Sequence, residues 1–327
     1  MKDIGIDLGT ANILIYVKGE GVVINEPTVV AIDADTKKVL AVGSDANEML
    51  GRTPGKVQVI KPLKDGVIAD FEYTEELLEG FLKKVKGKGK LTKPRILICC
   101  PSDITAVEKN AIKEAAERLG AKKVFMEEEP KVAAVGAGLD IAKPSGNMVI
   151  DIGGGTTDIA ILSLGGIVTS SSIKIAGNSF DTAIIDYVKN KYKLLIGERT
   201  AEEVKLEIGT VYEGNKNNKK SIKGRNLTNG LPTTIEISEA EMEEALYPLA
   251  KEIMKIAKEV LEKTPPELSA DIVDKGIVLT GGGALLNGLI ELLEVEFNVP
   301  IYIAENPLTC VAEGCGIMLD NLNLIDT

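Results

Sequence analysis

Two stretches of the sequence combine an aspartate with glycine and hydroxyl residues in nearly the same order. Residues 4–15 read I-G-I-D-L-G-T-A-N-I-L-I, and residues 148–162 read M-V-I-D-I-G-G-G-T-T-D-I-A-I-L. In each, an apolar run ends at an aspartate, Asp7 or Asp151, and a turn of small residues leads into a second apolar run, which predicts a β-hairpin. Such a turn offers backbone N–H groups to an anion, and the aspartate beside it can hold a hydrated cation. Two copies therefore predict two similar halves that face one phosphate chain.

A third glycine cluster follows another predicted strand. The strand is Gly276–Thr280, the glycines are Gly281, Gly282 and Gly283, and a helix is expected at Ala284–Glu294. This order allows the backbone to approach a ligand closely at a helix N-terminus. The sequence holds neither a P-loop nor a complete G-x-G-x-x-G fingerprint. A single glycine-rich turn is more often structural, but three that can close one pocket favour a nucleotide site between two domains.

Histidine is absent from the sequence, and this restricts the chemistry of any site. Because histidine is the commonest general base, catalysis here must use carboxylates, hydroxyls, backbone N–H groups and bound cations. Cys99, Cys100, Cys310 and Cys315 have neither a metal-site spacing nor a disulfide framework. We expect them to be reduced thiols in the core.

The composition is that of a globular protein with a large core. The 327 residues predict about two domains, and 44% of them are hydrophobic and 27% charged. A net charge of −11 argues against general attraction to nucleic acid, so no nucleic-acid partner is expected. No run approaches the roughly 18 apolar residues of a membrane span. The sequence opens on a predicted strand at Asp3–Ile4 with no leader ahead of it, which predicts a cytoplasmic protein.

Strands and helices alternate after the first hairpin. Strand Arg95–Cys100, helix Thr105–Leu119, strand Lys123–Met126 and helix Val132–Leu139 follow one another, with the acidic turn Glu127–Pro130 before the last helix. This alternation is typical of an α/β fold.

A basic segment, K-G-K-G-K-L-T-K at residues 86–93, follows an amphipathic helix at 75–85. Such segments are usually solvated loops. This one is also a concentrated positive patch on an acidic chain.

The second half contains a polar segment and a long helix. Residues 213–230 are rich in Asn, Lys and Gly and are predicted to be loop, followed by a strand at Thr233–Ile237. Ser238 and Glu241 form a capping box that opens the helix. Its apolar residues recur at heptad spacing, but the helix is short and contains Pro248. A kinked core helix is therefore favoured over a coiled coil.

Six motifs, taken as an ordered set, resemble one known family. They are I-D-L-G-T-A-N at 6–12, E-E-P at 128–130, D-I-G-G-G-T-T-D at 151–158, A-G-N-S-F-D at 176–181, G-E-R-T-A-E at 197–202 and L-T-G-G-G at 279–283. These motifs cover the chain from the first strand to the last helix. In their residue types and order they resemble the motifs of the MreB family of bacterial actins, within the superfamily of actin, sugar kinases and heat-shock chaperones.

This resemblance implies an α/β, actin-like fold of two domains, each with a mixed sheet flanked by helices and a smaller inserted subdomain. We expect domain I at residues 1–145 plus 308–327, with an insertion at about 31–73, and domain II at 146–307, with an insertion at about 182–237. ATP or ADP with Mg²⁺ would lie in the cleft between them.

The resemblance also assigns residues to the nucleotide. Those expected to hold the β- and γ-phosphates from opposite sides are Thr10, Ala11, Asn12, Gly153, Gly154, Gly155 and Thr156. Those expected along the rest of the nucleotide are Gly177, Glu202, Lys205, Gly281, Gly282 and Gly283, with Glu202 and Lys205 flanking the adenosine.

Four residues are implied in metal binding and catalysis. Asp7 and Asp151 would bind Mg²⁺, mostly through water. Glu129 resembles the residue that positions the attacking water, and Thr156 resembles the hydroxyl that assists it. The alternatives are a solvated turn carboxylate and an ordinary turn hydroxyl. Phosphoryl transfer needs positioning and charge neutralisation more than covalent catalysis, so a site without histidine suffices.

The chain departs from the family pattern at several positions. Asn178 stands where the family usually has aspartate, and Glu313 and Cys315 replace a more usual basic and a small residue. The family commonly inserts a pair of bulky apolar residues into the membrane, whereas the basic segment here has Leu91 among lysines. We therefore expect electrostatic contact with an anionic membrane surface. The residues expected to make it are Lys86, Lys88, Lys90, Leu91 and Lys93.

The implied function is that of a cytoskeletal protein that hydrolyses ATP slowly and polymerises head to tail into paired filaments under the cell membrane, where it controls cell shape. The alternative is a monomeric kinase or chaperone-type ATPase on the same fold. A kinase needs a sugar-binding constellation with a catalytic aspartate, and a chaperone needs a substrate domain after the ATPase. We expect neither here.

Overall fold

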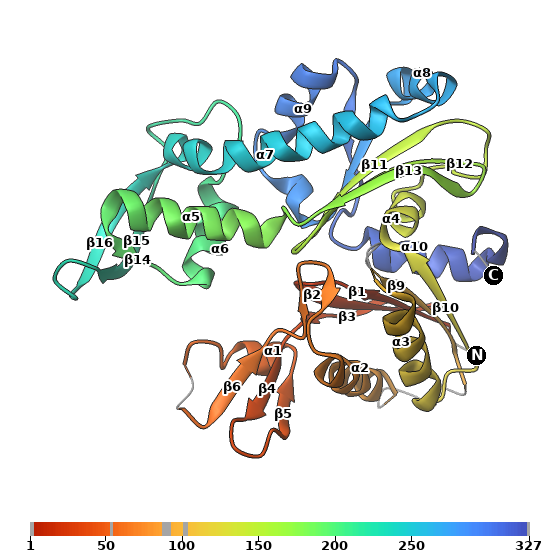
Figure 1. Cartoon of the computed structure of the whole chain (residues 1–327), viewed down its shortest axis with the longest axis horizontal. Coiled ribbons are helices and arrows are strands. Elements are labelled where there is room, and N and C mark those ends of the chain that lie inside the picture. The colour runs from red at the N-terminus through yellow and green to blue at the C-terminus, as the bar shows by residue number, and fades with distance from the viewer. Residues whose placement is uncertain (1–2, 53–54, 87–92, 101–103, 326–327) are drawn as a thin grey trace.

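The computed structural model describes residues 3–52, 55–86, 93–100 and 104–325. These residues form two five-stranded sheets, each accompanied by helices and by a smaller three-stranded sheet (Figure 1). Helices α4 (Glu129–Gly136) and α10 (Cys310–Asp320) lie between the two large sheets.

The first large sheet has the strand order β10-β9-β1-β2-β3. Its strands are β1 (Ile4–Leu8), β2 (Asn12–Val17), β3 (Gly21–Pro27), β9 (Arg95–Cys100) and β10 (Lys123–Glu128). β1 runs antiparallel to β2 and parallel to β9, and in these pairs Asp7 lies opposite Leu14 and Cys99. Every residue of β1 is buried, as expected for a central strand that is covered on both faces.

The second large sheet repeats this arrangement, with the strand order β13-β12-β11-β17-β18. Its strands are β11 (Asn147–Ile152), β12 (Thr157–Ser163), β13 (Gly166–Ile173), β17 (Ile277–Thr280) and β18 (Ile301–Ile303). β11 runs antiparallel to β12 and parallel to β17, where Asp151 lies opposite Thr280. The neighbours of β11 thus match those of β1. The predicted pair of similar halves is confirmed by this topology.

Three smaller units accompany the large sheets. One small sheet contains β4 (Val30–Asp33), β5 (Val39–Val42) and β6 (Val57–Ile60), next to α1 (Ser44–Asn47). The other contains β14 (Leu194–Leu195), β15 (Lys219–Asn226) and β16 (Pro232–Ser238). A separate hairpin is formed by β7 (Leu63–Lys64) and β8 (Val67–Ile68). The exact domain and insertion limits given above stay predictions.

The prediction of a loop at residues 213–230 is wrong, because β15 lies inside this segment and pairs with β16 in antiparallel register. Ile222 is the one fully buried residue of β15. The strand therefore has the polar composition of a loop although its backbone is paired.

The other helices surround the two large sheets. They are α2 (Phe71–Lys86), α3 (Ala106–Arg118), α5 (Gly177–Tyr192), α6 (Glu198–Ile208), α7 (Glu239–Glu262), α8 (Pro266–Lys275) and α9 (Leu289–Phe297), with the 3-10 segments η1 (Gly282–Leu285) and η2 (Leu322–Leu324). Helix α7 packs on β12 and β13, and α3 packs on β10.

One hydrophobic cluster is shared by the two halves. Leu97 of β9, Val149 of β11, Ala133 of α4 and Met318 of α10 are all fully buried in it. Because α4 and α10 pack on each other and on strands of both sheets, the halves are joined through this helical layer. The side chains at the start of α4 are thereby placed next to the ends of the central strands.

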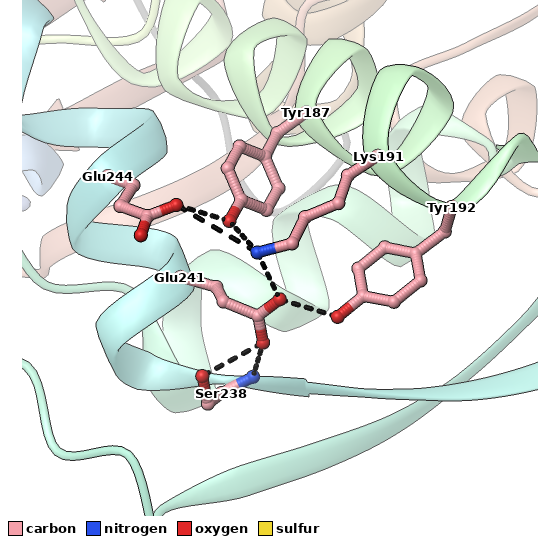
Figure 2. A network of polar contacts seen from close by, with 6 residues as sticks. All are labelled: Tyr187, Lys191, Tyr192, Ser238, Glu241 and Glu244. Carbon is pink, nitrogen blue, oxygen red and sulfur yellow. Dashed lines mark hydrogen bonds and ion pairs between the residues drawn. The ribbon is translucent and has the colours of Figure 1, made fainter.

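The start of α7 is held by a polar network with the end of α5 (Figure 2). The backbone N–H of Ser238 donates to Glu241 Oε2 at 2.8 Å, which confirms the predicted capping box. Glu241 also accepts from the Tyr192 hydroxyl and pairs with Lys191 at 2.9 Å. Burial alone would raise the pKa of Glu241, but these hydrogen bonds lower it to about 2. The helix passes through Pro248 and is core-facing, as predicted.

Candidate functional site

A cavity of about 650 Å³ is lined by residues of both halves. Every residue predicted to bind nucleotide or cation, or to act in catalysis, lines it. These are Asp7, Thr10, Ala11, Asn12, Glu129, Asp151, Gly153, Gly154, Gly155, Thr156, Gly177, Glu202, Lys205, Gly281, Gly282 and Gly283. They come from the two hairpins, from helices α4, α5 and α6 and from the turn after β17, so the fold brings together segments that are far apart in the sequence.

The turns of the two hairpins touch each other. A Cβ atom added at Gly154 would overlap the Ala11 side chain, and one added at Gly155 would lie 2.7 Å from Thr10 Oγ1. Side chains at these positions would push the halves apart, so glycine is required for this approach. The two turns therefore face the same cavity.

Helix α5 begins directly on the second turn. The N–H groups of Gly177 and Asn178 donate to the carbonyls of Gly153 and Gly154, at 3.1 and 2.8 Å. Asn178, which replaces the usual aspartate, thus contributes a backbone bond and also lines the cavity. The N-terminus of α5, with its partial positive charge, lies at the same cavity.

Three carboxylates converge on the cavity, and each disfavours the ionisation of the others. Burial and the charge of Asp151 raise the pKa of Asp7 to about 8. Burial and the charge of Asp158 raise the pKa of Asp151 to about 7. Burial and the charges of Asp151, Asp158 and Asp7 raise the pKa of Glu129 well above its usual range. Buried acids that act on one another in this way create a strong preference for a cation among them.

This set of donors fits a cation that keeps most of its water. Among the residues that the structure describes, no three His, Cys, Asp or Glu side chains are arranged to hold a metal ion. Mg²⁺ typically uses one or two carboxylates together with phosphate oxygens and water. Asp7 and Asp151 lie at corresponding positions of the two hairpins and match this pattern. A bound cation would offset the repulsion between them.

Glu129 occupies the first position of α4, immediately after β10. Pro130 follows in the first helical turn, where a missing N–H removes no helical hydrogen bond. Glu129 is half-buried at the cavity, and the charges of three aspartates disfavour its ionisation. Thr156, which is 8% exposed, lines the same cavity.

Helices α5 and α6 are joined at the cavity by an ion pair. Lys205 Nζ lies 2.9 Å from Asp181 Oδ1 and donates to the Gly177 carbonyl at 3.1 Å. Burial raises the pKa of Asp181 even though Lys205 opposes the shift. The charge of Lys205 is thus largely matched by Asp181. Glu202 lies nearly one turn before Lys205 on α6, and both line the cavity.

The third glycine cluster reaches the cavity, but it does not begin an α-helix. The predicted start of the helix Ala284–Glu294 is wrong, because the chain forms η1 first and α9 begins only after Gly288. Gly288 has a φ of 76°, a left-handed conformation that interrupts the helix. Gly281 has a φ of 77°, and a Cβ atom there would lie 2.6 Å from Asp151 Oδ1. The cluster therefore packs beside Asp151.

A family model described as MreB/Mbl protein matches residues 1–327, the whole chain. The chain belongs to the MreB/Mbl family. The cell shape-determining protein Mbl of Bacillus subtilis (strain 168) is 61% identical over 98% of this chain and 97% of that protein. The cell shape-determining protein MreB of Escherichia coli (strain K12) is 50% identical over 99% of this chain and 94% of that protein.

Solved structures confirm the predicted actin-like fold of this MreB/Mbl chain. Crystal structures of MreB5 of Spiroplasma citri bound to ADP and to AMPPNP are 42% identical to it, with a TM-score of 0.93. The match covers 98% of this chain and 97% of each of those.

Sequence reasoning does not assign a role to two acids that this MreB/Mbl chain places at the site. Asp158 lies opposite Asp151 in the β11–β12 register, is buried, and contributes to the raised pKa values of Asp151 and Glu129. Asp181 holds Lys205. Each is the last residue of one of the motifs quoted in the sequence analysis, and its place in that motif is the feature that could have indicated a role.

Exposed apolar side chains at the cavity are also missed by the sequence. Leu206 of α6, Leu285 of η1 and Leu308 before α10 are 76, 54 and 57% exposed, and all three line the cavity. They belong to three separate segments, so no local pattern could join them. Together they offer an apolar wall to a flat ligand.

The predicted membrane surface of this MreB/Mbl chain is mostly outside the described residues. This applies to Lys88, Lys90 and Leu91, whereas Lys86 is the last residue of α2 and Lys93 is exposed. Among the helices that the structure describes, none has the length and apolar character needed to cross a bilayer.

The remaining departures from the family pattern lie on α10. Glu313 accepts a hydrogen bond from the Thr309 hydroxyl at 2.7 Å, and the Cys315 thiol lies 3.9 Å from the Ile6 carbonyl. All four cysteines are buried and free, as predicted.

Proposed function

We propose that the chain binds ATP with Mg²⁺ in this cavity, hydrolyses it slowly and polymerises head to tail into filaments. Its family and its fold make it a cytoskeletal, actin-like protein. The observation that carries the proposal is the meeting of two glycine and hydroxyl turns with three carboxylates in one cavity. The adenine nucleotides bound by the related MreB5 support ATP as the ligand.

The phosphates are held in this proposal by the two touching turns. Thr10, Ala11 and Asn12 act from one side, and Gly153 to Thr156 act from the other, chiefly through backbone N–H groups. Asp7 and Asp151 hold Mg²⁺ through its water. When bound, Mg²⁺ neutralises charge on the phosphates and favours the ionised form of the buried acids.

Glu129 accepts a hydrogen bond from the attacking water, and the Thr156 hydroxyl helps to hold that water in place. This division of roles needs no histidine, because phosphoryl transfer depends on alignment and on stabilising spread-out charge. The position of Glu129 at the start of a buried helix supports the assignment, because packing there fixes its backbone.

The adenosine lies along the other part of the cavity. Glu202 and Lys205 flank it, and Gly177 and the glycines at 281–283 allow the backbone to approach it. The apolar wall of Leu206, Leu285 and Leu308 suits a flat base, because stacking on apolar surface needs no charged partner. Because Lys205 is already paired with Asp181, it flanks the adenosine and does not bind the phosphates.

The chain's main partner in this proposal is itself. A head-to-tail contact is heterologous and does not close, which is the geometry that builds filaments, and these are expected to pair. The basic segment attracts the filaments to the anionic inner face of the cell membrane, with about 1 kcal/mol per basic residue. This arrangement places the protein in the cytoplasm beside the membrane, where it controls cell shape.

Hydrolysis is tested by comparing phosphate release from the wild type and from Glu129→Ala with saturating Mg²⁺ and ATP. The variant is expected to bind ATP and to release phosphate about 100-fold more slowly, the usual scale for losing a group that orients a proton transfer. Glu128→Ala is the matched control, because the neighbouring acid does not line the cavity. Equal rates for the wild type and Glu129→Ala would contradict the assigned role.

A further inference from the structure

The β7–β8 hairpin places one glycine against both phosphate turns. The turn between its strands is Asp65–Gly66, with φ angles of 50° and 73°. Two successive left-handed residues define the tight turn that matches the twist of a two-stranded hairpin. Gly66 is buried at the tip of this turn.

The hairpin is anchored on both sides of the cavity. Leu63 of β7 is 1% exposed and belongs to the core of the first half. The Ala69 N–H donates to the Pro62 carbonyl at 2.9 Å, which closes the base of the hairpin. Lys61, just before β7, pairs at 2.7 Å with Glu198 at the start of α6, in the second half. The tip of the turn is thus held by the first core and tied to the opposite half.

Gly66 contacts the two threonines that come from opposite turns. Its N–H donates to Thr10 Oγ1 at 3.1 Å, in a buried hydrogen bond. A Cβ atom added at Gly66 would overlap Thr156 Cγ2 and would lie 3.4 Å from Thr156 Oγ1. The backbone of Gly66 therefore lies against the methyl group of Thr156. One residue thus fixes the hydroxyl of Thr10 directly and the rotamer of Thr156 by contact.

We propose that Gly66 is a positioning residue for ATP hydrolysis, which orients the Thr156 hydroxyl through contact with the Thr156 methyl group. This inference rests on the proposed function. Threonine is branched at Cβ, so a neighbour that fixes its methyl group also fixes where its hydroxyl points. Any side chain at position 66 moves the methyl group and turns the hydroxyl away, and misplacement of a catalytic group by about 1 Å can cost 100-fold in rate.

The central test is a double-mutant cycle between Gly66 and Thr156. Gly66→Ala is expected to keep nucleotide affinity close to that of the wild type and to lower the rate of phosphate release by about 10- to 100-fold. Thr156→Ser keeps the hydroxyl and removes the methyl group that the new Cβ atom would overlap. The double variant is therefore expected to hydrolyse ATP at nearly the rate of Thr156→Ser alone.

Gly19→Ala is the matched control. Gly19 also has a left-handed φ, of 81°, but an added Cβ atom there would meet no atom within 4 Å. It therefore reports the backbone strain of alanine without the overlap, and its hydrolysis is expected to equal that of the wild type. If Gly19→Ala loses as much activity as Gly66→Ala, or if Gly66→Ala slows hydrolysis in the Thr156→Ser background as much as it does in the wild type, the inference is overturned.

Thermal unfolding without nucleotide separates this inference from the proposed function. Gly66→Ala is expected to unfold at a lower temperature than Gly19→Ala, and Thr156→Ser is expected to recover that difference. A Gly66→Ala protein that does not fold and is not restored by Thr156→Ser also overturns the inference. A wild type that binds ATP but never hydrolyses it, with the recovery of stability intact, contradicts the proposed function and leaves the contact between Gly66 and Thr156 established.

Discussion

At the scale of single residues, the buried acids make the site selective for its charged ligand. Asp7 and Asp151 hold raised pKa values because each is buried near other carboxylates. A cation that replaces their protons would remove the repulsion, so the proposed binding of Mg²⁺ with nucleotide is expected to stabilise the fold. The repulsion between the buried carboxylates thus has two expected effects. It favours binding of a cation, and it destabilises the empty protein.

The repulsion between these carboxylates predicts how Asp7→Asn changes the free energy of unfolding as the pH changes. The pKa of Asp7 is about 8 in the folded protein, against 3.8 for an aspartate exposed to water. An acid whose folded pKa is raised loses stability as the pH rises from about 4 to about 8, because only the unfolded chain ionises readily in that range. Asp7→Asn lacks this loss and is expected to be more stable than the wild type by about 2 kcal/mol or more at pH 8.5. At pH 4 the two are expected to be nearly equal.

Denaturant unfolding without nucleotide at the two pH values measures this difference. Addition of Mg²⁺ and ATP is expected to stabilise the wild type more than Asp7→Asn. Asp35→Asn is the control, since Asp35 is exposed and away from the cavity. A variant that is less stable than the wild type at pH 8.5 would show that Asp7 is favourably paired in the empty protein.

At the scale of elements, the positive charge of the basic segment at 86–93 predicts that the chain binds anionic liposomes. Replacing Lys86, Lys88, Lys90 and Lys93 by glutamine is expected to abolish most co-sedimentation with anionic liposomes. Each lysine contributes about 1 kcal/mol, and the attraction is screened by salt. Lys216, Lys219, Lys220 and Lys223, changed in the same way, provide a control of equal charge from another segment. Unchanged liposome binding by the first variant would remove the basic segment as the membrane surface.

Hairpins and caps are the elements that the sequence predicts well, because their signals are local. The two Asp-led hairpins and the Ser238–Glu241 capping box need only neighbouring residues. The strand β15 is missed because its pairing with β16 outweighs its polar composition. The helix expected directly after Gly283 begins only at Leu289, because Gly288 interrupts it.

The site follows the same rule. The residues that the motifs assign to nucleotide, cation and catalysis all line the cavity. Gly66, Leu206 and Leu308 reach the site only through tertiary contacts between segments with no shared pattern. Asp158 lies within a quoted motif, but its effect on Asp151 depends on strand register, which the motif does not give.

At the scale of the whole molecule, two sheets of equal topology are joined by the α4–α10 layer. Each half contributes one of the two hairpin turns, and the exposed ion pair between Lys61 and Glu198 links the halves. A ligand that contacts both turns therefore favours one relative position of the halves. Because Glu129 begins α4, the layer that joins the halves also carries the residue proposed to position the attacking water. In the proposed function, we expect nucleotide state to change the surfaces that meet in a filament.

In the proposed function, the turns of the two hairpins have different roles. The first turn, with Thr10 and Asn12, mainly holds phosphate. The second, with Thr156, lies near Glu129 and determines hydrolysis. A monomeric kinase or chaperone-type ATPase on this fold would use the same cavity, so the cavity does not distinguish these functions from a filament. Assembly distinguishes them.

The most direct measurement is sedimentation of the purified chain over a range of concentrations, with Mg²⁺ and ATP and without nucleotide. We expect the protein to pellet above a critical concentration when ATP is present, and Glu129→Ala to pellet at least as well, because binding and not hydrolysis favours assembly. Without nucleotide most of the protein is expected to stay in the supernatant. A chain that binds ATP but remains monomeric at every concentration would contradict the proposal and favour the monomeric ATPase.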